Sequence, residues 1–437
     1  MLKKVLLTIP LYLFLGCDYQ DFTEIKKSEK ESSIEPKISK SSTIRTSVPM
    51  LGILVSYDNI EISSDDTFWH TKLFGTEEHQ LNSYYKEVSS NHFEFTKVEE
   101  DYGIKNDSIV SIHLPKNHPN TDVDSLYFER KVYPDFKTAL ELVDEYVDFS
   151  NYDKNADGYI TPDELLITFI IAGYEDAYEG RHVINGIWGH QSCLSATLGE
   201  VIVDSVSLLN CEHKGNFAVF GEKHNKDNPH NATIGIIAHE LGHSTFNLPD
   251  LYSTFNPNEG GIGYFGIMGS GTWATQNSEE YAGNTPAHFC AWSKIYNNWI
   301  EPIVVKNEEV TLYETASLKY NILKIPIDTN SYYLLENRNN SGYDRGLYSL
   351  EGKFNGGIAI WKIDETKVTK AHIEENDVNN DTVHKGVDLV EAVEGTIDSD
   401  GGGGDEKALY YDSNKNHFST LVTNISQRGS AMTLNLN

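Results

Sequence analysis

The chain has 437 residues, of which 39% are hydrophobic and 23% charged, a composition that excludes an intrinsically disordered protein. At roughly 150 residues per domain this length predicts two or three domains. Its 65 acidic and 35 basic residues give a formal net charge of −30, so we expect no nucleic-acid partner, because polyanions would be repelled. Four cysteines are too few for a disulfide scaffold of this size.

The N-terminus has the pattern of an export signal. Two lysines precede an apolar stretch that is too short to span a bilayer and that ends in Leu15-Gly16-Cys17. A small residue directly before a cysteine resembles the lipobox of bacterial lipoproteins, which predicts lipidation of Cys17 and anchoring of the protein in the bacterial cell envelope. The alternative is a plain signal peptide. We therefore expect a lipoprotein signal at 1–17 and, from its Ser, Lys and Glu content, a flexible tether at 18–47.

The body of the chain predicts an α/β (α+β) domain at 48–300 followed by a β-rich lobe at 301–437. In the first part, apolar runs and helical periodicity predict strands at 50–55, 93–96 and 165–171, and helices at 67–74, 80–88, 139–147, 233–243 and 287–296. After Pro302, short alternating strands such as 332–335 and 358–361 are separated by turn residues.

The predicted helix at 233–243 carries a metal-binding pattern, H-E-x-x-H. His239 and His243 are four residues apart, so they project from one helix face and can bind the same ion. Glu240 lies beside them as a candidate general base. The alternative, two core histidines bonded to the backbone, is disfavoured because the apolar run would bury polar groups without partners unless a metal fills the gap.

A catalytic zinc site with an open position needs a third protein ligand. Asp250 is the nearest carboxylate after the helix, whereas Glu279 and Glu280 are alternatives from further along the chain. Met268 lies in a glycine-rich stretch at 261–271 that suits a tight turn beneath a metal site, although such a methionine also serves as core packing.

Four segments together resemble the immune inhibitor A-type (thuringilysin family) bacterial metallopeptidases: H-E-L-G-H, L-P-D-L-Y, G-I-G-Y-F-G-I-M-G-S-G and P-A-H-F-C-A-W-S-K-I-Y-N-N-W. The resemblance extends from about Val48 to the C-terminus. It implies a secreted zinc endopeptidase with a metzincin-like catalytic domain and a β-sandwich-like appendage. One departure is an extra residue before Asp250, so Asn247 has to replace glycine at the turn, which its tolerance of the left-handed conformation permits. The third ligand stays open at this point.

A second candidate metal site is the twelve-residue segment Asp153–Glu164, which matches a calcium-binding loop with glycine at position six. A strand rather than a helix is predicted after it, which favours a structural calcium ion; an Asx turn without metal is the alternative. The ligands would be the side chains of Asp153, Asn155 and Asp157, the backbone carbonyl of Tyr159, and a bidentate Glu164.

Two further features bear on export and substrate binding. In an oxidising compartment Cys193 and Cys211 are expected to pair and to leave Cys290 buried. The segment Phe217–Phe220, just before the metal-binding helix, is expected to be the edge strand that pairs with an extended substrate.

These observations predict a lipid-anchored zinc metalloendopeptidase that acts on proteins or peptides, with Glu240 as general base, one catalytic Zn²⁺ and at least one structural Ca²⁺. The alternative is a non-catalytic surface-binding adhesin on a degenerate peptidase fold. The intact Glu240 favours the enzyme, because a binding module has no need of that base.

Overall fold

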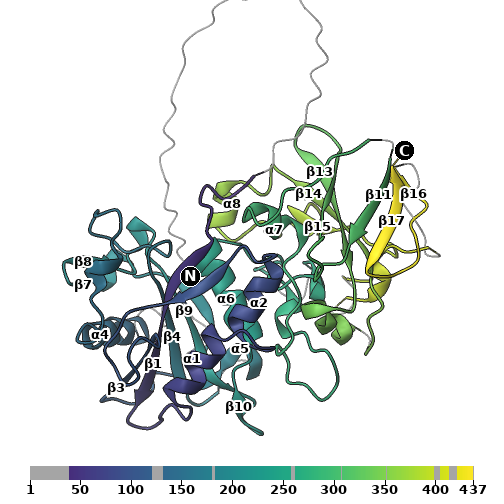
Figure 1. The fold of residues 1–437 in the computed structure, drawn as a ribbon. Coiled ribbons are helices and arrows are strands. Elements are labelled where there is room, and N and C mark those ends of the chain that lie inside the picture. The colour runs from purple at the N-terminus through teal and green to yellow at the C-terminus, as the bar shows by residue number, and fades with distance from the viewer. Residues whose placement is uncertain are drawn as a thin grey trace, which may run out of the picture. The chain divides into compact units, whose positions relative to one another are not determined.

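The central element of the structure is an eight-stranded mixed sheet (Figure 1). The computed structural model describes residues 39–120, 131–179, 183–256, 261–306, 308–350, 352–397, 404–412 and 421–436, all within the unit Glu35–Asn437. Cys17, the predicted signal and most of the predicted tether lie outside these residues, and the predicted boundary at residue 300 stays a prediction. No helix in the described ranges is both long and apolar enough to cross a bilayer.

In the sheet the order is β10-β9-β4-β1-β2, and β3, β5 and β6 pair with β1, β4 and β9 respectively. Pairings are parallel except those of β6 and β10 with β9. The strands are β1 (Ser47–Tyr57), β2 (Glu94–Lys97), β3 (Ile109–Leu114), β4 (Leu166–Glu175), β5 (Gly186–Ile187), β6 (His190–Ser192), β9 (Phe217–His224) and β10 (His230–Asn231).

The continuous apolar runs of β1 and β4 are explained by helices on both faces of the sheet. Along β1, Met50 and Leu54 pack in one core, whereas Leu51, Ile53 and Val55 pack in the other, because successive side chains of a strand point to opposite faces. The first core includes α1 (Asp66–Phe74), α2 (Leu81–Val88) and α6 (Ile234–Phe246), and the second includes α4 (Tyr133–Val143).

Two predicted helices have different bounds in the structure. The helix predicted at 139–147 is α4, which starts earlier because Pro134 lies in its first turn and Phe136 joins its buried face. The helix predicted at 287–296 is only α7 (Ala291–Tyr296). The backbone just before α7 instead hydrogen-bonds to the glycine-rich stretch, through the N–H of Ala287 and the carbonyl of His288. The short helix α5 (Asp176–Glu179) follows β4.

The C-terminal part contains two antiparallel sheets, as its alternating pattern predicts. Their facing strands share a hydrophobic cluster that includes Leu312, Leu335, Ile360 and Leu434. One sheet has the order β11-β17-β16 and the other β12-β13-β14-β15, with a separate pair β7-β8 in the first part of the chain. The strands are β7 (Val201–Val203), β8 (Val206–Leu208), β11 (Glu309–Tyr313), β12 (Leu323–Pro326), β13 (Ser331–Arg338), β14 (Gly357–Asp364), β15 (Val387–Leu389), β16 (Val422–Thr423) and β17 (Ala431–Leu436).

A buried ion pair ties this part to the metal-binding part. Arg338, fully buried on β13, donates to both carboxylate oxygens of Asp344 and to the carbonyl of Phe265, in the glycine-rich stretch. Asp344 in turn accepts the N–H of His288 at 3.3 Å. The glycine-rich stretch is therefore supported from the C-terminal sheet by charge-assisted hydrogen bonds.

Candidate metal centre and cleft

The helix α6 ends where the metal-binding pattern requires a change of direction. Asn247 follows it with φ +53° and ψ 37°, in the left-handed region, and its N–H bonds the carbonyl of His243 at 2.9 Å. The N–H of Leu248 returns to Gly242 at 3.3 Å, a common way of satisfying the last helical carbonyls. The prediction that Asn247 replaces glycine at this turn is confirmed.

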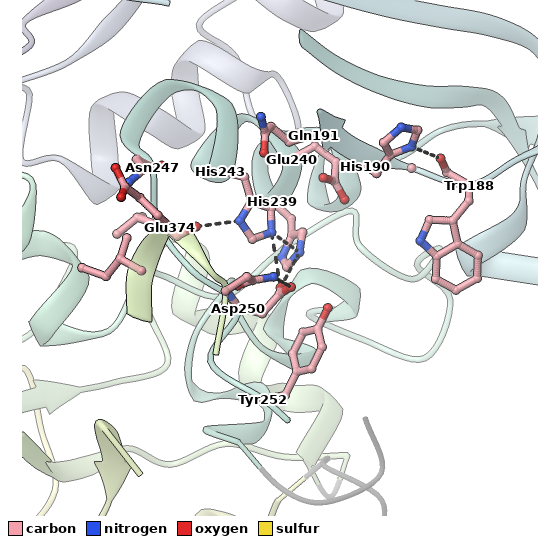
Figure 2. Close-up of a pocket in the computed structure, with 14 residues that line it drawn as sticks. Trp188, His190, Gln191, His239, Glu240, His243, Asn247, Asp250, Tyr252 and Glu374 are labelled. Carbon is pink, nitrogen blue, oxygen red and sulfur yellow. Dashed lines mark hydrogen bonds and ion pairs between the residues drawn. The ribbon is translucent and has the colours of Figure 1, made fainter. Parts of the chain in front are cut away.

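The turn brings a carboxylate back to the two histidines (Figure 2). Asp250 Oδ1 lies 3.2 Å from His239 Nε2 and 3.3 Å from His243 Nε2, and the two Nε2 atoms are 3.2 Å apart. Within the described ranges, these three residues are the one group of acidic, histidine or cysteine side chains whose ligand atoms lie within 4.8 Å of one another. Glu280 instead accepts hydrogen bonds from Gln276 and Thr285, and the exposed Glu279 is also outside the group.

The hydrogen bonds around the metal group occupy Nδ1 of each histidine, and the two Nε2 atoms face Asp250 Oδ1. His239 Nδ1 contacts the carbonyl of Ile267 at 2.8 Å, and His243 Nδ1 contacts that of Leu248 at 2.6 Å. Because a carbonyl needs a donor, each Nδ1 carries the proton and each Nε2 is free to accept. Asp250 Oδ1 is buried without a hydrogen-bond partner. Three converging acceptors repel unless a cation lies among them, so the residues fit a zinc ion.

The pKa values of His243 and Asp250 are shifted because the two groups are buried next to each other. Burial lowers the pKa of His243, but the carboxylate of Asp250 outweighs it and the net shift is upward. Burial raises the pKa of Asp250, but His243 and His239 bring it well below its usual range. The group therefore favours positive charge at its centre.

Glu240 lines the same cavity, whose volume is about 220 Å³. Burial raises its pKa to about 8, with His239 opposing the shift and Asp250 and Glu175 adding to it. Glu175 is itself fully buried and accepts the N–H groups of Gly189 and Gly221 at 2.8 and 2.9 Å. A carboxyl group whose pKa is raised toward the working pH can both accept a proton and return it, as general acid–base catalysis requires.

Met268 lies against α6 at Gly242. A Cβ added to Gly242 would be 2.7 Å from Met268 Sδ, so a larger residue at this position would require the methionine side chain to shift. The Met268 carbonyl accepts the N–H of Leu251 at 2.7 Å, next to the candidate ligand Asp250. The methionine is 1% exposed and packs in the core that also contains residues of α6, and its role as a Met-turn stays a prediction.

The prediction that Phe217–Phe220 is the edge strand that binds substrate is wrong. Phe217–Phe220 belongs to β9, which pairs with β4 on one side and with β6 on the other. Among the described strands, β6 and β10 each pair with β9 alone, so they form the edge at this end of the sheet, and β6 is the one beside Phe217–Phe220. His190 and Gln191 of β6 and the preceding Trp188 line the cavity. No sequence pattern indicates this strand, since three residues are too few for an alternating pattern.

The C-terminal part supplies another wall of the cavity, which the sequence did not indicate. Ile373 and Glu374 of α8 (Lys370–Glu374), together with Asn376 just after it, line the cavity. Tyr252 also lines it, and Figure 2 shows its hydroxyl directed toward the metal group. Asn376 is 126 residues from Asp250, too far for local periodicity to relate them.

The predicted calcium loop forms a tight turn held by its own side chains. Asp153 accepts the N–H groups of Asp157 and Gly158 at 3.1 and 2.9 Å. Glu164 Oε2 accepts the N–H of Thr161 at 3.0 Å, while its buried Oε1 has no partner. The acids of this loop do not gather as closely as the metal group at α6. Calcium binding stays a prediction.

The predicted disulfide Cys193–Cys211 is confirmed, with a Cα–Cα distance of 5.1 Å. Cys290 is free and buried, as expected.

Comparison with known proteins gives the same picture. The family described as "Immune inhibitor A peptidase M6, catalytic domain" matches residues 57–300. The "Pre-pro-metalloprotease PrtV" of two strains of Vibrio cholerae serotype O1 is 29% identical over 195 residues, which are 40% of this chain and 20% of each relative. The aligned part therefore spans about a fifth of the length of these relatives.

Proposed function

Because the chain belongs to the immune inhibitor A (M6) peptidase family, a family of zinc metalloproteases, we propose that it is a zinc-dependent endopeptidase acting on proteins. The observation that carries the proposal is the His239–His243–Asp250 group at the end of α6, with Glu240 in the same cavity. A binding protein that had lost catalysis would have no use for a buried carboxylate beside an intact metal group.

In this proposal His239, His243 and Asp250 hold the ion, and Glu240 moves the proton. Bound zinc supplies a Lewis acid that polarises the scissile carbonyl and lowers the pKa of water. Glu240 accepts the proton of the attacking water and returns it to the leaving amine. The edge of β6 lies along the cavity, where an extended peptide can add as a further strand through backbone hydrogen bonds.

Two accompanying proposals come from the sequence. Asp153–Glu164 binds a structural calcium ion, which is supported by its ligand pattern and by the unpartnered Glu164 Oε1. The protein is exported and anchored through lipidated Cys17, which is supported by the lipobox-like Leu15-Gly16-Cys17. Replacing Cys17 by Ser should release the protein from membranes of its native host, and unchanged partitioning would refute the anchor.

The test of the proposed function separates the base from the ligands. Glu240→Gln should retain one zinc per chain while its rate of protein digestion falls by at least about 100-fold, the usual contribution of general-base assistance. Asp250→Ala should lose zinc as well as activity, since two histidines alone hold it weakly. Glu279→Gln, a matched change of an exposed glutamate outside the metal group, should leave both unchanged.

Digestion of casein or a peptide library, with and without a zinc chelator, supplies the activity measurement. A wild-type rate in Glu240→Gln would refute the mechanism. A zinc-loaded wild-type protein that cleaves nothing would refute the peptidase and favour the adhesin. If Asp250→Ala keeps its full zinc content and Glu279→Gln loses zinc, the third zinc ligand is Glu279 rather than Asp250.

A further inference from the structure

Asp250 is held from outside the metal group by one side chain of the C-terminal part. Asn376 Oδ1 accepts the backbone N–H of Asp250 at 2.6 Å, and Asn376 Nδ2 donates to Asp250 Oδ2 at 2.7 Å. A backbone N–H can only donate, so the orientation of the amide is fixed by its partners. Asp250 Oδ2 is therefore occupied, and Oδ1 is the oxygen left to face the two histidines.

The turn that contains Asn376 also hydrogen-bonds to the residues that follow Asp250. Asn379 Nδ2 donates to the carbonyl of Leu251 at 3.2 Å, and Asn380 Oδ1 accepts the N–H of Thr254 at 2.7 Å. Asn376 itself has φ +53°, a left-handed conformation that asparagine tolerates better than most residues. Three side chains of one turn thus bond to the segment that contains the candidate ligand.

We propose that Asn376 is a positioning residue that selects Oδ1 of Asp250 as the metal-binding oxygen, so that the C-terminal part of the chain completes the zinc site. The inference rests on the proposed function in that zinc is the ion bound there. A ligand carboxylate whose second oxygen accepts a hydrogen bond loses less rotational freedom when the ion binds. Outer partners of this kind typically change metal affinity by about 10- to 100-fold.

The decisive variant is Asn376→Asp in the full chain. It keeps the size of the side chain and the acceptor for the Asp250 N–H, but it places an oxygen where Nδ2 now lies 2.7 Å from Asp250 Oδ2. Asp250 Oδ2 loses its donor and the carboxylate is no longer held with Oδ1 toward the histidines, so the zinc dissociation constant, measured by competition with a chelating indicator, should rise by about 10- to 100-fold. Asn376→Gly removes the side chain, permits the same φ, and should weaken zinc binding within that range.

Asn424→Gly is the matched control, because Asn424 is exposed and has the same φ of +53°. Its zinc dissociation constant should equal that of the wild type. The thermal midpoint of the zinc-free protein is the second measurement, since a merely structural role would lower this midpoint and leave zinc affinity unchanged.

Zinc affinity within twofold of wild type in Asn376→Asp, or failure of both Asn376 variants to fold without zinc, would overturn the proposal. If only Asn376→Gly fails to fold, Asn376→Asp decides. A different result would refute the proposed function, namely wild-type protein that binds zinc but cleaves no protein. In that case the effect of Asn376 on zinc affinity can still be measured.

Discussion

Removal of the disulfide should destabilise the protein by an amount that follows from its position in the chain. Cys193 and Cys211 are 18 residues apart, and closing a loop of that length lowers the entropy of the unfolded chain by an equivalent of about 3 kcal/mol at 25 °C. Cys193→Ser combined with Cys211→Ser should lower the free energy of unfolding by about that amount. Equilibrium unfolding in urea at fixed zinc and calcium measures it.

The same change should affect substrate binding, because Cys193 directly follows the edge strand β6. Two backbone hydrogen bonds, from Leu194 to Leu209 and from Cys211 to Leu194, still hold the loop ends at 2.7 and 3.2 Å. We therefore expect the loop to loosen rather than unfold, with a higher KM for protein substrates and unchanged zinc content.

Reductant provides the control for this experiment. Reduced wild-type protein should match the double variant, and the double variant should not respond to reductant. A decrease in the free energy of unfolding of less than about 0.5 kcal/mol in the double variant would refute the loop-entropy reasoning. It would mean that the disulfide hardly restricts the unfolded chain, although it closes a loop of 18 residues.

Three further predictions address other parts of the molecule. Saturating calcium should raise the melting temperature of the wild type by mass action but not that of Glu164→Gln, and an equal calcium-induced rise in that variant would exclude the loop as the site. Burial lowers the pKa of His118 from 6.5 to about 4, so the unfolded chain binds a proton between these pH values that the folded protein does not. The free energy of unfolding should therefore fall as the pH drops from 6.5 to 4, by about 3 kcal/mol from His118. Measured by urea unfolding, the free energy of His118→Asn should depend less on pH, and an unchanged pH dependence would contradict the role of His118. Gly242→Ala should destabilise the protein by about 1–3 kcal/mol and weaken zinc binding, because the new methyl group displaces Met268, whereas unchanged melting and zinc affinity would show that Met268 can move without cost.

Much of the site could be predicted locally. The spacing of His239 and His243 fixes their common helix face, because the helical period is a property of the backbone. The alternating and continuous apolar patterns located β1, β4, β13 and β14, since burial on one or both faces of a sheet leaves a direct imprint on composition. Asn247 at the helix end was predictable because few residues other than glycine adopt the left-handed conformation readily.

Only the tertiary structure could decide the rest. It distinguished Asp250 from Glu279 and Glu280, because all three are carboxylates after the helix and only the path of the chain brings one of them to the histidines. It replaced Phe217–Phe220 by β6 as the edge, since a strand is an edge through what lies beside it rather than through its own residues. It also brought Asn376 to Asp250 across 126 residues, a contact determined by the packing of the C-terminal part and therefore without any local pattern in the sequence.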